Sequence, residues 1–331
     1  MRSSIFLSSI LLLTLTAFAQ DQISDPGARQ ICATVKDVEP PADDRPSAAE
    51  EKALTNCSSL ELYFGFGQPA DPVKARKCAY AQIDRGAKAL LGGRVMLMMI
   101  YANGKGASRN FDLALKFACA IGDAPGDAAG RVHQLDRLKK ANWAGSNFSV
   151  CDHSSSHEMY EQCAILQERF DKIERDRKFN ELISRWTPRQ QKAFRAFMQE
   201  ADRFFEVQAG NGVNLEGTFE ISEEAFLRNN LLSSLQQFEA GELPRSSPNS
   251  SNDEFQRAEA ERSTYMRTQS GEVARWGTVT RESVRTSEEA WRRYGNAWIA
   301  FARQRYPNVS ERAWKAWLDQ DRVVTLNRFL H

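Results

Sequence analysis

Apolar residues recur at intervals of three and four positions along most of the chain, and no convincing run alternates apolar with polar residues. This spacing is typical of helices that bury one face, so we expect an all-α protein. The short stretch from Gly217 to Ile221 is the one weak strand candidate. The chain should therefore fold by packing helices against helices.

Two aromatic stripes follow this spacing in the C-terminal half. The first comprises Phe194, Phe197, Ala201 and Phe204, and the second, about 97 residues later, comprises Trp291, Tyr294, Trp298 and Phe301. Stacked rings can bind sugars, but this spacing indicates the buried seam of a helix, where each ring buries a large area. We expect both stripes to lie in the core, together with Trp314 and Trp317.

Two polar segments interrupt the helical pattern. Three prolines between Glu39 and Pro46 exclude a helix there, because proline lacks the backbone donor, and we interpret residues 20–51 as an N-terminal linker. Residues 241–252, rich in serine, proline and asparagine, form a second linker. The folded regions predicted from these breaks are 52–142, 151–240 and 253–331.

The first 19 residues have the pattern of a secretory signal peptide. An uncharged run follows Arg2 and ends in Ala17-Phe18-Ala19, an A-x-A cleavage site before Gln20. At about 15 residues the run is shorter than the roughly 20 that a membrane-spanning helix needs, and no later stretch is apolar enough to span. We expect a periplasmic or secreted protein.

Export determines how the cysteines are interpreted. The chain has six, at Cys32, Cys57, Cys78, Cys119, Cys151 and Cys163. An even number in an oxidising compartment favours disulfides over metal sites or free thiols. Because no Cys-x-x-Cys pair occurs, a thiol-redox enzyme and a zinc ribbon are both disfavoured.

Residues 52–142 contain an internal repeat. Its first copy has Leu62-Tyr63, Gly65, Gly67, Asp71 and Ala75, and about 38 residues later the second has Ile100-Tyr101, Gly104, Gly106, Asn110 and Ala114. Tyrosine would pack at a helix end, the glycines would form the turn, and alanine would allow the next helix to approach. The pattern resembles the Sel-one-like repeats, relatives of the tetratricopeptide repeat, which implies stacked helical hairpins.

The hairpin also predicts a disulfide. If the turn is centred between Tyr63 and Pro72, Cys57 and Cys78 lie about equally far from it on antiparallel helices and therefore face each other. Cys32 is then left with Cys119 by elimination, a pairing that nothing else in the sequence supports.

A second motif begins at Cys151. Cys151, Glu158-Met159, Cys163, Asp176 and Asn180 match, in type and spacing, the bacterial lysozyme-inhibitor LprI-like family, which this region resembles. Phe179 replaces the family's leucine. The second aromatic stripe, followed by Arg322 and Leu326, resembles a further copy without cysteines at 253–331. The resemblance implies helical domains that bind lysozyme. The family's later cysteines are absent, which would leave Cys151 and Cys163 to pair with each other.

Candidate chemistry is sparse. The 44 basic and 43 acidic residues give almost no net charge, which argues against nucleic-acid binding. His153 and His157 are four apart, but Ser154 to Ser156 between them favour a helix cap over a metal site. No nucleophile motif or phosphate-binding loop is present, so we expect neither an enzyme nor a cofactor. Two hypotheses remain: an exported inhibitor of lysozyme or another cell-wall lytic enzyme, and a periplasmic scaffold that holds a protein partner through its repeats.

Overall fold

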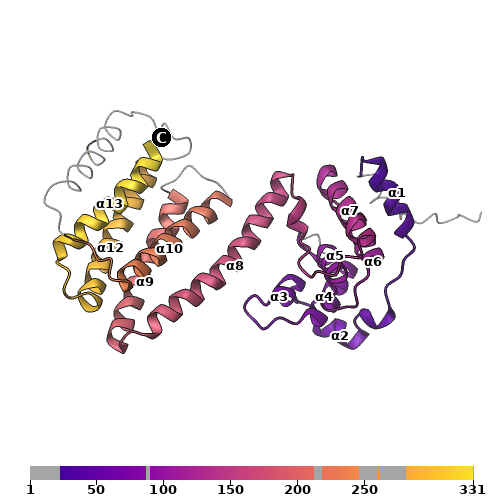
Figure 1. Ribbon diagram of the computed structural model, residues 1–331, viewed down its shortest axis with the longest axis horizontal. Coiled ribbons are helices and arrows are strands. Elements are labelled where there is room, and N and C mark those ends of the chain that lie inside the picture. Colours follow the sequence, from indigo (N-terminus) through magenta and orange to yellow (C-terminus); the bar gives the residue numbers. More distant parts are fainter. Residues whose placement is uncertain (1–22, 87–89, 212–217, 246–259, 261–280, 331) are drawn as a thin grey trace, which may run out of the picture. The chain divides into compact units, whose positions relative to one another are not determined.

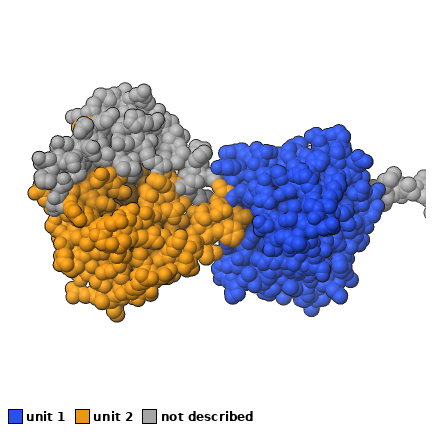
Figure 2. Space-filling model, viewed as in Figure 1, with its two compact units in different colours: residues 1–163 blue, residues 164–331 orange. Residues whose placement is uncertain are grey.

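The computed structural model describes residues 23–86, 90–211, 218–245, 260 and 281–330. Throughout this part of the chain the regular structure is helical, without a strand, which confirms the all-α prediction (Figure 1). The chain divides into two compact units, residues 1–163 and 164–331 (Figure 2). The predicted signal peptide and residues 246–252 of the predicted second linker lie outside the described residues.

The first unit is a stack of short helices. Its elements are α1 (Pro26–Val35), η2 (Ala42–Asp44), α2 (Ala48–Ala53), α3 (Ser59–Phe64), α4 (Pro72–Asp84), α5 (Gly93–Asn103), α6 (Phe111–Cys119), α7 (Pro125–Lys140) and η3 (Val150–His153). Neighbouring helices from α3 to α7 pack on one another in chain order, and α1 packs on α6 and α7. Such sequential packing is typical of helical-hairpin repeats.

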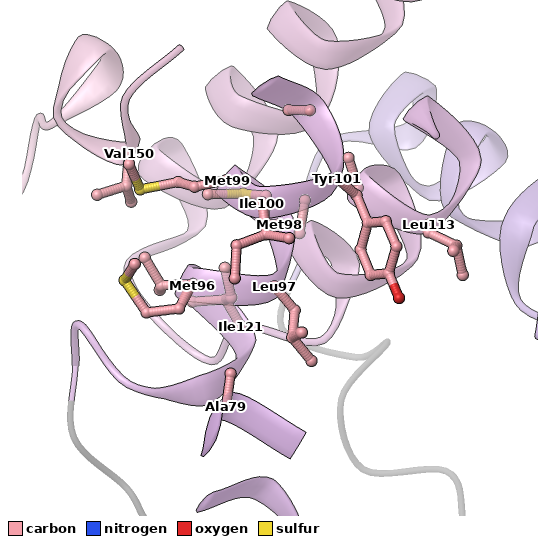
Figure 3. Packing of buried hydrophobic residues seen from close by; sticks show 14 of the residues in the cluster. Ala79, Met96, Leu97, Met98, Met99, Ile100, Tyr101, Leu113, Ile121 and Val150 are labelled. Atoms are coloured by element: carbon pink, nitrogen blue, oxygen red, sulfur yellow. The ribbon is translucent and has the colours of Figure 1, made fainter. Parts of the chain in front are cut away.

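Helix α5 forms the centre of this stack. Every residue from Val95 to Asn103 is buried, with Met96, Leu97 and Met98 fully enclosed. Figure 3 shows their side chains together with other buried residues of this core, among them Ala79 of α4 and Leu113 of α6. A helix that is apolar on all sides must be covered on all sides, so α5 requires both neighbouring hairpins.

The prediction that residues 20–51 form a linker is wrong. Residues 26–35 form α1, whose start is capped by the Asp25 carboxylate, 2.7 Å from the backbone nitrogen of Ala28. Its buried face is only three residues, Ala28, Cys32 and Val35, too short a pattern to stand out in the sequence.

The proline-rich part of that segment is also held in place. The Tyr101 hydroxyl donates to the Asp44 carboxylate at 2.7 Å, and Arg76 lies 3.3 Å from the same side chain. The Tyr80 and Tyr101 hydroxyls are 2.7 Å apart, and burial raises the pKa of Tyr80 to about 12. This polar cluster ties η2 to α4 and α5.

The two hairpins repeat with a different register from the predicted one. The backbone N–H of Asp71 donates to the carbonyl of Leu62 at 2.8 Å, and that of Asn110 donates to the carbonyl of Tyr101 at 3.0 Å. Both partners are offset by 39 positions, so the structural equivalent of Tyr101 is Leu62 and not Tyr63. The glycines and the helix-capping residues define the repeat, and the tyrosines do not share its register.

Two equivalent turn glycines give a matched test of this packing. Gly67 and Gly106 both have positive φ, but a Cβ on Gly106 would overlap the Pro72 carbonyl, whereas one on Gly67 has nothing within 4 Å. Alanine at Gly67 should cost about 1 kcal/mol through backbone strain alone. Alanine at Gly106 adds a steric overlap and should cost about 3 kcal/mol. Urea unfolding of the two variants measures the difference, and equal losses would show that the close approach contributes nothing.

The second unit is a bundle of longer helices. Its elements are α8 (His157–Ser184), whose first turns belong to the first unit, α9 (Pro188–Asn211), α10 (Thr218–Glu239), α12 (Arg281–Arg305) and α13 (Glu311–Leu330). Residues 218–221 lie in α10, so the strand candidate at 217–221 is wrong. These residues belong to the same helix as the buried Leu227, Leu231 and Leu235.

The two aromatic stripes meet in a single core. Phe194 lies 5.2 Å from Phe301 between ring centroids, and Phe197 lies 5.1 Å from Trp298. The residue numbers of the contacting rings increase along α9 while those of their partners on α12 decrease, so the two helices are antiparallel neighbours. The prediction that the stripes and Trp314 are buried is confirmed except at Trp291, which is half-buried like Trp317. The predicted separation of 151–240 from 253–331 differs from this arrangement, since each stripe covers the other.

All six cysteines are paired. The disulfides are Cys32–Cys119, Cys57–Cys78 and Cys151–Cys163, with Cα–Cα distances of 5.8, 6.0 and 5.7 Å. The hairpin had predicted Cys57–Cys78 and the resemblance to the LprI-like family had left Cys151 with Cys163, whereas Cys32–Cys119 had followed only by elimination. All three lie in the first unit, which contains the cysteine motif at 151–163. Disulfides of this number fit a protein that folds outside the reducing cytoplasm.

Candidate functional site

A groove of about 520 Å³ runs between α8, α9 and α10 within the second unit. Its lining consists of Glu168, Lys172, Arg175, Asp176, Phe179, Met198, Asp202, Glu224 and Arg228. We call it the α8–α10 groove. Seven of these nine side chains are charged, so it differs from the mostly apolar pockets that hold small molecules.

Two arginines fix its walls. The Arg175 guanidinium, 4% exposed, donates to Glu168 at 2.6 Å, and Arg228 donates to Asp202 at 2.6 Å and to Glu224 at 2.7 Å. Burial opposes the charged form of Arg228, but its bonds to Asp202 and Glu224 outweigh burial and raise its pKa. Because a buried charge is costly without a partner, both arginines are held in these positions.

One further ion pair of the groove, between Lys172 and Asp176, is exposed to solvent. Lys172 and Asp176 lie 2.5 Å apart on α8, with 62% and 52% of their side chains exposed. An ion pair this exposed contributes at most about 1 kcal/mol, so Asp176 can exchange its partner at little cost. Of the carboxylates in the groove, Asp176 and the half-exposed Asp202 are the most accessible to a ligand.

The apolar part of the lining comes from Phe179 and Met198. Phe179 packs on Phe194 of the core, with ring centroids 6.2 Å apart. The position where this chain has phenylalanine instead of the LprI-like leucine therefore forms part of the groove and is anchored to the aromatic core.

A second hollow of about 320 Å³ lies beside the C-terminal ends of α8 and α10, two of the three helices that form the groove. It is lined by Lys178, Glu181, Leu182, Arg185, Gln236, Glu239 and Ala240. Its carboxylates are already engaged, since Glu181 pairs with Arg185 at 3.3 Å and Glu239 accepts from Arg305 and from the Tyr306 hydroxyl. Glu181 is 56% exposed, but it is shared by two arginines, Arg177 and Arg185, each at 3.3 Å.

The four family-motif positions do not form one site. Met159 is fully buried in the core of the first unit, and Glu158 is exposed beside it in the first turn of α8. Asp176 and Asn180 lie several turns further along that helix, and only Asp176 lines the groove. Met159 is therefore a packing residue, and Asp176 is the one motif position that lines the groove.

Arg175 and Arg228 were missed at the level of sequence. Arg175 pairs with Glu168, 7 positions away, and Arg228 pairs with Asp202, 26 positions away. Neither separation is the three or four positions that mark an ion pair on one helix. Glu224, four positions before Arg228, does have that spacing. Charges on α8 and α10 are typical of solvated helix faces, and the sequence holds no signal that Arg175 and Arg228 line a groove.

The groove is equipped to bind, and no catalytic set is evident in it. Its lining contains no histidine, cysteine or hydroxyl group. Among the residues that the structure describes, no group of three or more His, Cys, Asp or Glu side chains could hold a metal ion, and His157 pairs with Glu161 at 3.3 Å. No helix in the described ranges is both long and apolar enough to cross a membrane.

Comparison with models of known protein families, with curated proteins and with solved structures finds nothing that matches this chain. The resemblance to the LprI-like family and to the Sel-one-like repeats accordingly rests on the type and spacing of the residues named above.

Proposed function

We propose that this chain is an exported binding protein that inhibits lysozyme or another cell-wall lytic enzyme through the α8–α10 groove. The observation that carries the proposal is a groove with rigid, ion-paired walls and an accessible carboxylate at Asp176, in the region that resembles the LprI-like family. The three disulfides support export, because they are typical of periplasmic and secreted proteins.

The charges of the groove suit a basic target. Four carboxylates line it against three cations, although the whole chain is almost neutral. A lysine or arginine of the partner would replace Lys172 at Asp176 and reach Asp202 across the groove. The walls are already ordered, so binding would cost little side-chain entropy.

Charge reversal in the groove tests this proposal. Asp176→Lys with Asp202→Lys should weaken binding to lysozyme at least tenfold, since two attractive contacts become repulsive. The double variant Asp37→Lys with Glu51→Lys, two exposed acids of the first unit, makes the same change in net charge and should bind normally. Titration calorimetry and residual lysozyme activity at micromolar protein are the measurements. Unchanged lysozyme activity with no heat of binding for the natural chain would refute lysozyme as the target.

The scaffold hypothesis has a specific observation in its favour. Two hollows of about 460 and 270 Å³ beside α2, α3 and α4 share Ala53, Leu54 and Lys74, and Val73 at their edge is 51% exposed. Stacked helical hairpins bind partners through the surface that the repeats form, and α3 and α4 belong to the first hairpin. If this surface holds a partner, Val73→Asp should abolish capture of that partner, while the Asp176→Lys, Asp202→Lys variant should retain it.

A further inference from the structure

The start of α9 presents cations without carboxylates. From Leu182 to Gln199 the chain contains Arg185, Arg189, Lys192 and Arg195 and not one acidic residue. The last three are spaced three apart on a helix, so they follow one side of α9 over about 9 Å. We call these four side chains the α9 basic face; α9 is labelled in Figure 1.

The cations of the α9 basic face that lie on the helix itself are exposed and unpaired. Arg189, Lys192 and Arg195 are all exposed, and no ion pair or hydrogen bond of the described residues engages their charged groups. Surface arginines with an acid one turn away on their own helix behave differently: Arg177, for example, pairs with Glu174 at 2.8 Å and with Glu181 at 3.3 Å. Three unpaired neighbours of one sign on a nearly neutral chain are therefore unusual within this molecule.

The nearest carboxylates along the chain are already engaged. Glu200, the first acid after the face, pairs with Arg203 at 2.8 Å and lies 3.8 Å from Arg293. Glu181, the last acid before it, is shared by Arg177 and Arg185. The positive end of the α9 dipole adds to the same potential, since α9 begins at Pro188.

We propose that the α9 basic face binds a linear polymer that carries phosphate groups. Three of its four cations are arginines, whose planar guanidinium matches the geometry of a phosphate oxygen pair better than a lysine ammonium does. The three-residue spacing repeats the charge along the helix, as a polymer with repeated phosphates requires. None of its four cations lines the α8–α10 groove, although Arg185 lines the smaller hollow beside it, so the face would operate whether or not the chain inhibits lysozyme.

A protein partner or a lipid bilayer fits this face less well. The exposed large apolar residues among those described are Val73, Tyr160, Ile173 and Phe226, and none of them lies on α9. Protein interfaces depend on buried aromatic or aliphatic anchors, and interfacial helices depend on an apolar face inserted into the membrane. The cations of the α9 basic face, with the exposed Ala196 and Gln199 beside them, supply neither kind of apolar contact. Electrostatic binding of a soluble polyanion is therefore favoured.

Long-chain inorganic polyphosphate is the probe that tests this proposal. Fluorescence anisotropy should show binding. The logarithm of the association constant should fall linearly with the logarithm of the salt concentration, with a slope of about −3 for four contacted phosphates. The variant Arg189→Gln, Lys192→Gln, Arg195→Gln should bind at least tenfold more weakly and with a slope about two units shallower. Arg189→Lys with Arg195→Lys should keep the slope and lose part of the affinity, which separates charge from folding.

The control carries the same change in charge on the first unit. Arg85, Arg94 and Arg137 are exposed and have no ion pair within the described chain, and they are scattered over α4, α5 and α7. Their triple glutamine variant should bind polyphosphate like the natural chain. Equal binding by both triple variants would overturn the proposal. So would binding to phosphatidylglycerol vesicles or to an acidic protein without binding to polyphosphate.

Discussion

Replacing both Cys32 and Cys119 with alanine should lower the free energy of unfolding of the first unit by about 4–5 kcal/mol. The bridge joins residues 87 positions apart, and the chain-entropy model assigns a loss of this size to so long a loop. It also fixes α1 to α6, so α1 should be the first element to lose protection. Native-state hydrogen exchange of amides in α5 measures the loss, because this helix is the most enclosed of the unit.

The Cys151–Cys163 bridge is the matched control for this prediction. Its cysteines are 12 positions apart, and the same model gives about 3 kcal/mol for their replacement by alanine. The order of the two losses follows from loop length alone. A larger loss from the short loop than from the long one would show that local packing, not chain entropy, dominates these bridges.

Trp298→Ala should cost about 3–5 kcal/mol in the second unit. The side chain is fully buried and its ring lies 5.1 Å from Phe197, 4.9 Å from Trp317 and 5.5 Å from Trp314, so the cavity left behind cannot close easily. Because both aromatic stripes share this core, amides of α9 and α12 should lose protection together, while those of α5 keep it.

Tyr160→Ala provides the comparison for Trp298→Ala. Tyr160 is 60% exposed, so its loss should change the free energy of unfolding by no more than about 0.5 kcal/mol. If Trp298→Ala affected α12 and left α9 protected, the stripes would belong to separate folded regions, as the sequence had suggested, and the single core described above would be wrong.

The sequence predicts which helix faces are buried much better than it predicts which faces meet. The spacing of Phe194 to Phe204 and of Trp291 to Phe301 identifies two seams, and both are buried. Nothing in a periodic pattern specifies that one seam covers the other, because their contact depends on how the whole bundle closes. Two domains were therefore predicted where one core exists.

Local features of the sequence explain why the repeat was predicted and why helix α1 and the groove walls were missed. The repeat is recognisable because its left-handed glycines Gly65 and Gly104 have few alternatives at a helix end. Helix α1 was missed because three small buried residues give little periodic signal beside a proline-rich segment. The walls of the α8–α10 groove were missed because Arg175 takes a partner two turns away on α8 and Arg228 takes one on a different helix, α9.

Hydrogen exchange of the full chain with and without a saturating amount of lysozyme tests the proposed binding site most directly. We expect slower exchange in the presence of lysozyme along α8 from Glu168 to Phe179 and along α10 from Glu224 to Arg228, with no change in α4. Unchanged exchange throughout the chain, or protection confined to the hollows around Leu54, would contradict recognition through the α8–α10 groove.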